Sequence, residues 1–154
     1  MRAMKTLIVL RHAKAEHIPG VLDFERGLTN RGQRNAREAG VLIGPLKPDL
    51  ILSSASKRTK ETAELLGLAA PLELDRDIYE AYADELLVLL RQVGPDVGTL
   101  VLVGHNPSVH ELVIGLAGDQ VDTFPPGAFA VIELPGPWSE IDSGTGTLVD
   151  SHRP

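Results

Sequence analysis

The chain has 154 residues, a length that predicts one domain, residues 1–154, with a core of its own. Its 43% hydrophobic content is typical of soluble globular proteins, and the lack of cysteine excludes disulfide bonds and thiolate catalysis. The net charge of −6 argues against nucleic acid as a partner, since such binding depends on lysine and arginine.

The apolar run near the N-terminus is four residues long, whereas a signal peptide needs about 7–15 apolar residues. No stretch of the sequence approaches the about 20 apolar residues that span a membrane. We therefore expect a cytoplasmic protein with no membrane partner. The sequence predicts no particular oligomeric state.

The first predicted strand is the apolar run Leu7–Leu10, which is followed directly by Arg11 and His12. Short apolar runs rich in β-branched residues are typical of strands buried on both faces of a parallel sheet. A polar loop over residues 13–28 follows. Residue 29 or 30 then caps a helix that runs to about residue 42 and stops at a Gly-Pro pair.

A second strand is predicted at Leu50–Ser53, where Ser54 or Ser56 opens a helix that ends at Gly67. A short strand is expected over residues 72–74. Leucines at helical spacing predict a further helix over residues 80–93, which a Gly-Pro pair ends.

The strand predicted at Leu100–Val103 leads into Gly104 and His105. Asn106 is expected to cap the next helix, with proline at its first position, and a capping box over residues 108–111 also fits. The tail has two further strands, over residues 128–134 and 146–149. We expect these two strands to form an antiparallel pair at a sheet edge.

These elements predict an α/β fold, a three-layer α/β/α domain with a mostly parallel sheet and an antiparallel edge. Ligands of open parallel sheets bind beyond the carboxyl ends of the strands. If the strands before His12 and His105 are parallel neighbours, both histidines lie at that edge. Arg11 and Arg58 follow strand ends in the same way, and guanidinium groups suit phosphate oxygens. The set predicts a phosphoryl-handling site.

Each member of this set has an expected role. His12 as a neutral imidazole can attack phosphorus and become phosphorylated. Arg11 and Arg58 neutralise the phosphoryl oxygens, because this transfer depends mainly on positioning and charge. His105 donates a hydrogen bond to a phosphate oxygen, near a helix start that favours anions. Lys14 is a further candidate for phosphate binding.

The same residues argue against other kinds of site. A metal site at His17 and His110 is disfavoured, because each is five residues from His12 or His105 rather than at helical i, i+4 spacing. We expect neither a metal nor a cofactor, and His110 is expected to be an ordinary helix residue. Ser53 and Ser54 lack the G-x-S-x-G pattern of a serine nucleophile. A phosphate-binding module without catalysis is the alternative of a different class.

The motifs also resemble those of a known family, the histidine phosphatase superfamily with its phosphoglycerate mutase-like fold, in the form found in SixA-like phosphohistidine phosphatases. The similarity covers most of the chain and keeps the family's order. It rests on four strings and on the segment before the late strand: Leu10-Arg11-His12-Ala13-Lys14-Ala15, Leu28-Thr29-x-x-Gly32, Ser53-Ser54-x-x-x-Arg58-Thr59-x-x-Thr62-Ala63, Val103-Gly104-His105-Asn106-Pro107 and Phe124-Pro125-Pro126-Gly127-Ala128.

The resemblance implies that Arg11, His12, Arg58 and His105 form the core of a phosphate pocket and that His12 becomes phosphorylated. Glu80 lies where the wider family places its acidic residue, which makes it the candidate for a general acid. The expected enzyme is a metal-independent phosphatase. Its partner is a protein carrying phosphohistidine, because short connections around the site leave it open. A small phosphorylated metabolite is the alternative substrate, and mutase activity is disfavoured.

Overall fold

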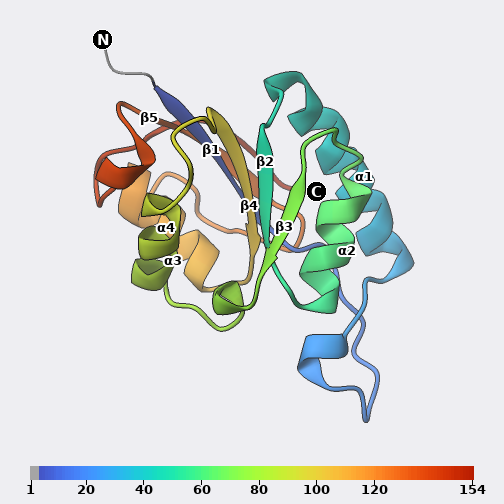
Figure 1. The fold of residues 1–154 in the computed structure, drawn as a ribbon. Coiled ribbons are helices and arrows are strands. Elements are labelled where there is room, and N and C mark those ends of the chain that lie inside the picture. Colours follow the sequence, from blue (N-terminus) through green and yellow to red (C-terminus); the bar gives the residue numbers. More distant parts are fainter. Residues whose placement is uncertain (1–3) are drawn as a thin grey trace.

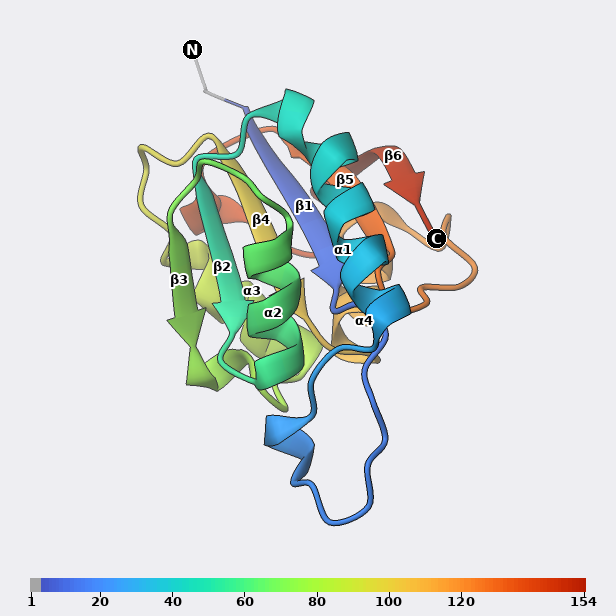
Figure 2. The same ribbon diagram turned by 90° about the vertical axis from the view of Figure 1, so that its right-hand side faces the viewer.

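The computed structural model describes residues 4–154, which form a six-stranded sheet in the order β3-β2-β4-β1-β5-β6. Strands β3, β2, β4 and β1 are mutually parallel (Figure 2). At one edge of the sheet, β5 pairs antiparallel with β1 on one side and with β6 on the other. The α/β fold with a mostly parallel sheet and an antiparallel edge is therefore confirmed. The strands are β1 Lys5–Arg11, β2 Leu50–Ser54, β3 Leu72–Asp75, β4 Thr99–Gly104, β5 Phe129–Leu134 and β6 Thr147–His152.

Helices cover both faces of the sheet, α1 and α2 on one face and α3 and α4 on the other (Figure 1). Their bounds are α1 Asn30–Ile43, α2 Lys57–Leu65, α3 Ala83–Arg91 and α4 Ser108–Ala117. Four 3-10 turns lie between these elements: Asp23–Glu25, Gly44–Leu46, Arg76–Ile78 and Trp138–Glu140. Within residues 4–154 no helix has both the length and the apolar character needed to cross a bilayer.

Strand β1 shows why its sequence is apolar without alternation. Leu7 and Val9 pack into the core beneath α3 and α4, while Ile8 and Leu10 pack into the core beneath α1 and α2. All four side chains are fully buried. Successive side chains of a strand point to opposite faces, so a strand covered on both faces is apolar at every position.

Two predicted helix starts were wrong. The helix expected from residue 80 begins at Ala83, because Glu80 has a φ of 65°, outside the right-handed helical region. The Glu85 carboxylate then accepts the Tyr82 backbone N–H at 2.9 Å, which caps the helix at its true start.

Asn106 does not cap α4, which begins at Ser108 without a side-chain cap. The Asn106 side-chain amide instead donates to the Phe124 carbonyl at 2.8 Å. The predicted capping box is also absent, since the Ser108 hydroxyl donates to the His105 carbonyl at 2.9 Å. Both side chains therefore fasten the segment after β4 rather than the helix terminus.

Two irregular segments flank the carboxyl end of β1. The first, here called the site loop, comprises residues 12–29 and projects beyond the edge at which β1, β2 and β3 end (Figures 1 and 2). A bridge between Ala15 and Leu28 closes its base. The second, here called the strap, comprises residues 118–128 and connects α4 to β5.

Helices α1 and α2 approach closely because Gly40 of α1 has no side chain. A Cβ at this position would lie 1.9 Å from the Leu66 carbonyl oxygen at the end of α2. That contact is against backbone, so the two segments would have to separate.

Gly40→Ala is expected to lower the free energy of unfolding by about 1–3 kcal/mol, the usual cost of overpacking a core. Gly115→Ala is the matched control, since Gly115 is an exposed helical glycine with open space around its Cβ position. The control should raise the free energy of unfolding by about 0.5–1 kcal/mol. Urea unfolding of both variants measures the difference, and equal effects would contradict the close approach of α1 and α2.

Candidate active site

The two histidines meet because β1 and β4 are parallel neighbours in register. Arg11 lies opposite Gly104, and the His12 backbone N–H continues the pairing by donating to the Gly104 carbonyl at 3.0 Å. Each histidine follows its strand, so both emerge at the same edge of the sheet. Their ring centroids are 5.4 Å apart.

The His12 ring is oriented by a hydrogen bond to its own loop. Its Nδ1 lies 2.8 Å from the Ala13 carbonyl oxygen, and because a carbonyl only accepts, Nδ1 carries the proton. Nε2 is then the nitrogen with a free lone pair. The Ala13 backbone N–H donates to the Thr62 hydroxyl at 3.0 Å, which fastens this turn to α2.

The His105 ring contacts residues from two other strand ends. Its Nε2 is hydrogen-bonded to the Ser54 hydroxyl at 2.9 Å, at the end of β2. The Tyr79 ring, just after β3, lies edge-on to it with centroids 5.5 Å apart. His105 Nδ1 is buried and has no hydrogen-bond partner among the described residues.

Two guanidinium groups complete the cluster. Arg11 donates from Nη1 to the Phe124 carbonyl at 3.1 Å, and Arg58 donates from Nη1 to the Asp23 carbonyl at 2.7 Å. The Nε–H of each arginine is buried without a partner in the part of the chain that the structure describes. Buried donors are normally paired, so these two N–H groups are suited to an oxyanion.

Asp23 of the site loop is the acidic member of the cluster. Its carboxylate accepts from Arg58 at 3.0 Å, from Arg26 at 3.0 Å and from the Tyr79 hydroxyl. These hydrogen bonds, that of Tyr79 foremost, hold the pKa of Asp23 well below its usual range. Asp23 is therefore ionised and orients Arg58, and burial together with this carboxylate raises the pKa of Tyr79.

Burial governs the charge of both histidines. It is the largest cause that lowers the pKa of His12 to about 3, and it likewise lowers the pKa of His105 to about 4, with Arg58 and Arg11 adding to both effects. Burial and then Arg58 also lower the pKa of Arg11. At neutral pH the free site thus has two neutral imidazoles beside two cationic guanidinium groups.

Comparison with known proteins agrees with this arrangement. The family model described as histidine phosphatase superfamily (branch 1) matches residues 7–87. The chain belongs to the histidine phosphatase superfamily. An uncharacterized protein of Mycobacterium tuberculosis, Rv1276c, is 31% identical, over 94% of this chain and 99% of the relative.

Two solved structures place this histidine phosphatase in the SixA-like branch. A candidate phosphohistidine phosphatase SixA from Nakamurella multipartitia is 28% identical with a TM-score of 0.92, covering 98% of this chain and 96% of the other. A second, from Agrobacterium tumefaciens, is 27% identical with a TM-score of 0.84, covering 97% and 98%. The protein is thus a phosphatase with the phosphoglycerate mutase-like fold.

The remaining candidates of this histidine phosphatase make no direct hydrogen bond to the cluster within the described residues, although Glu80 adds, after burial and Asp23, to the raised pKa of Tyr79. Lys14 and Glu80 have exposed side chains, and no hydrogen bond or ion pair within residues 4–154 joins either one to His12, His105 or the two arginines. His17 is hydrogen-bonded to Arg26, away from His110. Among the described residues, no group of three or more potential metal ligands gathers.

The sequence does not predict Asp23, Ser54 and Tyr79, which contact the cluster, or Asn106, which shares the Phe124 carbonyl with Arg11. Ser54 lacks the pattern of a nucleophile, but its position at a strand end indicates that it lies near His105. Asp23 and Tyr79 lie in irregular segments, where no periodicity marks them. Asn106 carried a recognisable capping signal, which pointed to a different role.

The low pKa values of the two histidines predict a neutral free site over a wide pH range. In an NMR titration of the free protein, the imidazole ¹⁵N shifts of His12 and His105 should remain those of the neutral rings down to about pH 5, because protonation would bury a charge beside two arginines. His12→Gln and His105→Gln assign the signals. A midpoint near 6.5 for either ring would contradict the buried environment.

Proposed function

We propose that this phosphatase acts through a phosphohistidine intermediate on His12. The observation that carries the proposal is the geometry around that ring. His12 has its free lone pair on Nε2, a second imidazole 5.4 Å away, and two arginines whose Nε–H groups have no partner among the described residues. A nucleophile beside a set of fixed donors is what phosphoryl transfer requires.

In the first step, His12 Nε2 attacks phosphorus, an N–P bond forms, and the bond to the leaving group breaks. Arg11 and Arg58 neutralise the charge on the transferred oxygens, and His105 donates a hydrogen bond to one of them. In the second step, water attacks the phosphohistidine, which releases inorganic phosphate and restores His12. No metal or cofactor has a role in either step.

The proposed substrate is a protein that carries phosphohistidine. The similarity to two candidate SixA phosphohistidine phosphatases, at 28% and 27% identity, supports this class. The chemistry agrees with it, because phosphohistidine can be protonated on its second ring nitrogen before its N–P bond breaks and then leaves as neutral imidazole, whereas an alkoxide leaving group needs a proton from a general acid. Asp23 is held ionised and the exposed Glu80 has no hydrogen bond to the two histidines within residues 4–154, so a leaving group that needs no strong general acid suits this site.

A comparison of kcat/KM for a phosphohistidine protein with that for small phosphoesters tests the substrate class. We expect the larger value for the protein substrate. A larger value for a small phosphoester would replace this proposal with a metabolite phosphatase. Absence of turnover on every substrate would indicate a phosphate-binding module.

His12→Ala is expected to lose nearly all turnover, because no neighbouring side chain replaces the nucleophile. Acid-labile phosphate should be trapped on His12 when the unaltered protein is quenched rapidly with substrate, and mass spectrometry locates it. His152→Ala is the control histidine, since His152 lies on β6 and packs against Phe129. Retained activity in His12→Ala, or phosphate trapped on a serine, would refute the mechanism.

A further inference from the structure

The strap, residues 118–128, lies against the site through several hydrogen bonds, which include backbone bonds of Gly127 and Ala128 to Arg11. The Phe124 carbonyl accepts from Arg11 Nη1 at 3.1 Å and from the Asn106 side-chain amide at 2.8 Å. The Gly127 backbone N–H donates to the His12 carbonyl at 3.0 Å. The position of the Phe124 peptide therefore helps to set the direction of the Arg11 guanidinium.

His110 of α4 holds the strap from within the fold. Its Nε2 lies 2.6 Å from the Val121 carbonyl oxygen, and because that oxygen only accepts, His110 is the donor. Its ring also stacks on the Phe124 ring, with centroids 5.7 Å apart and planes 11° from parallel. One side chain thus contacts the strap at two points, and one of them is the residue that binds Arg11.

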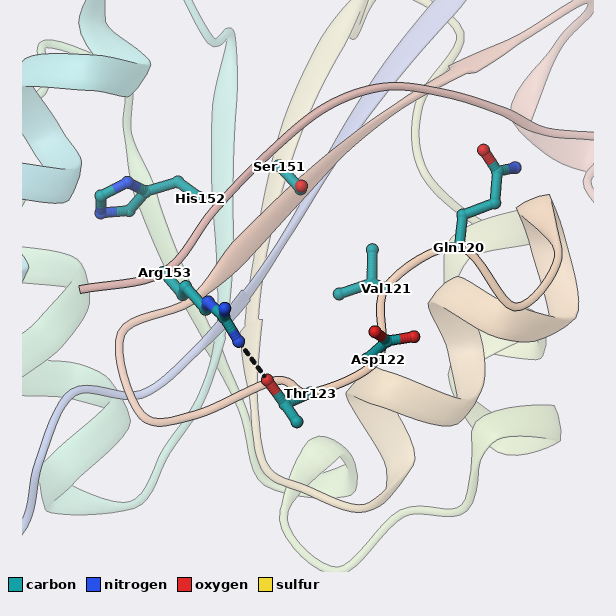
Figure 3. Close-up of a pocket in the computed structure, with 7 residues that line it drawn as sticks. All are labelled: Gln120, Val121, Asp122, Thr123, Ser151, His152 and Arg153. Carbon is teal, nitrogen blue, oxygen red and sulfur yellow. Dashed lines mark hydrogen bonds between the residues drawn. The ribbon is translucent and has the colours of Figure 1, made fainter.

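The outer side of the strap is packed less closely. Figure 3 shows Gln120–Thr123 running beside Ser151–Arg153. These residues line a cavity of about 330 Å³. One hydrogen bond crosses here, from Arg153 Nη1 to the Thr123 hydroxyl at 2.8 Å. With a cavity on that side, the strap depends on its inner contacts, and Phe124 is buried while Arg153 is exposed.

We propose that His110 is a positioning residue for the phosphate site. By fixing the Val121 carbonyl and the Phe124 ring, it fixes the Phe124 carbonyl and hence the direction of Arg11. His110 does not touch the substrate. The inference rests on the proposed function, since it assigns Arg11 to oxyanion binding.

The test measures the dissociation constant of tungstate, an oxyanion probe, together with kcat and KM for an aryl phosphate. His110→Phe keeps a ring against Phe124 but has no N–H for Val121. We expect it to weaken tungstate binding about five- to tenfold, the effect of one lost hydrogen bond. His110→Gln, which retains a donor, should restore binding to within about twofold of the unaltered protein.

Combination with Arg11→Ala separates positioning from a general structural effect. If His110 acts through Arg11, adding His110→Phe to Arg11→Ala should leave tungstate binding unchanged. Thermal unfolding of each variant establishes that it is folded. His110→Glu matches glutamine in shape but has no N–H, so the glutamine–glutamate pair provides the same comparison if His110→Phe does not fold.

His152→Phe is the matched control, because His152 lines the cavity on the outer side of the strap. The centroid of its ring lies 5.2 Å from that of Phe129. This variant should bind tungstate as the unaltered protein does. Unchanged binding in His110→Phe, or an equal loss with and without Arg11, would overturn the role of His110. Failure of the unaltered protein both to bind tungstate and to turn over substrate would instead overturn the proposed function.

Discussion

The parallel pairing of β1 with β4 is the constraint on which the site depends. Arg11 lies opposite Gly104, so the residue after each strand is a histidine at the same level of the sheet. A shift of one residue would turn one ring toward the opposite face. The register agrees with burial, since the apolar runs Leu7–Leu10 and Leu100–Val103 pair residue for residue, and a slipped pairing would place a polar residue that flanks one run beside the apolar core of the other.

The same burial determines the charges. Two guanidinium groups lie close enough that Arg58 lowers the pKa of Arg11, and protonating either histidine beside them would add a third positive charge in a poorly solvated place. The imidazoles are therefore neutral in the free protein. A neutral His12 is the form that can act as a nucleophile. A bound phosphate would bring the negative charge that makes a donating, protonated His105 more favourable.

Much of this arrangement could be predicted from the sequence, and the limits have physical causes. Continuous apolar runs marked the buried strands, and the residues that follow them marked His12, His105 and Arg11. The contacts of Arg58 and Arg11 with Asp23 and Phe124 could not be predicted, because they come from irregular segments without periodicity. Two of these acceptors are backbone carbonyls, which any residue type supplies. The start of α3 was missed because the leucines that predict this helix begin only at Leu86 and do not mark its first turn, and nothing in the sequence marks the left-handed conformation of Glu80.

The site loop and the strap make different contacts with the arginines that they bind, and the difference bears on function. Both supply a backbone carbonyl, from Asp23 to Arg58 and from Phe124 to Arg11. A carbonyl orients a guanidinium without neutralising it, so Arg11 retains its full charge for an oxyanion. Arg58 also pairs with the Asp23 carboxylate, which an arriving phosphate must share or displace. In the proposed mechanism Arg11 is thus the stronger electrostatic contributor to anion binding, and we propose for that reason that the strap, which orients Arg11, has a correspondingly large influence on the site.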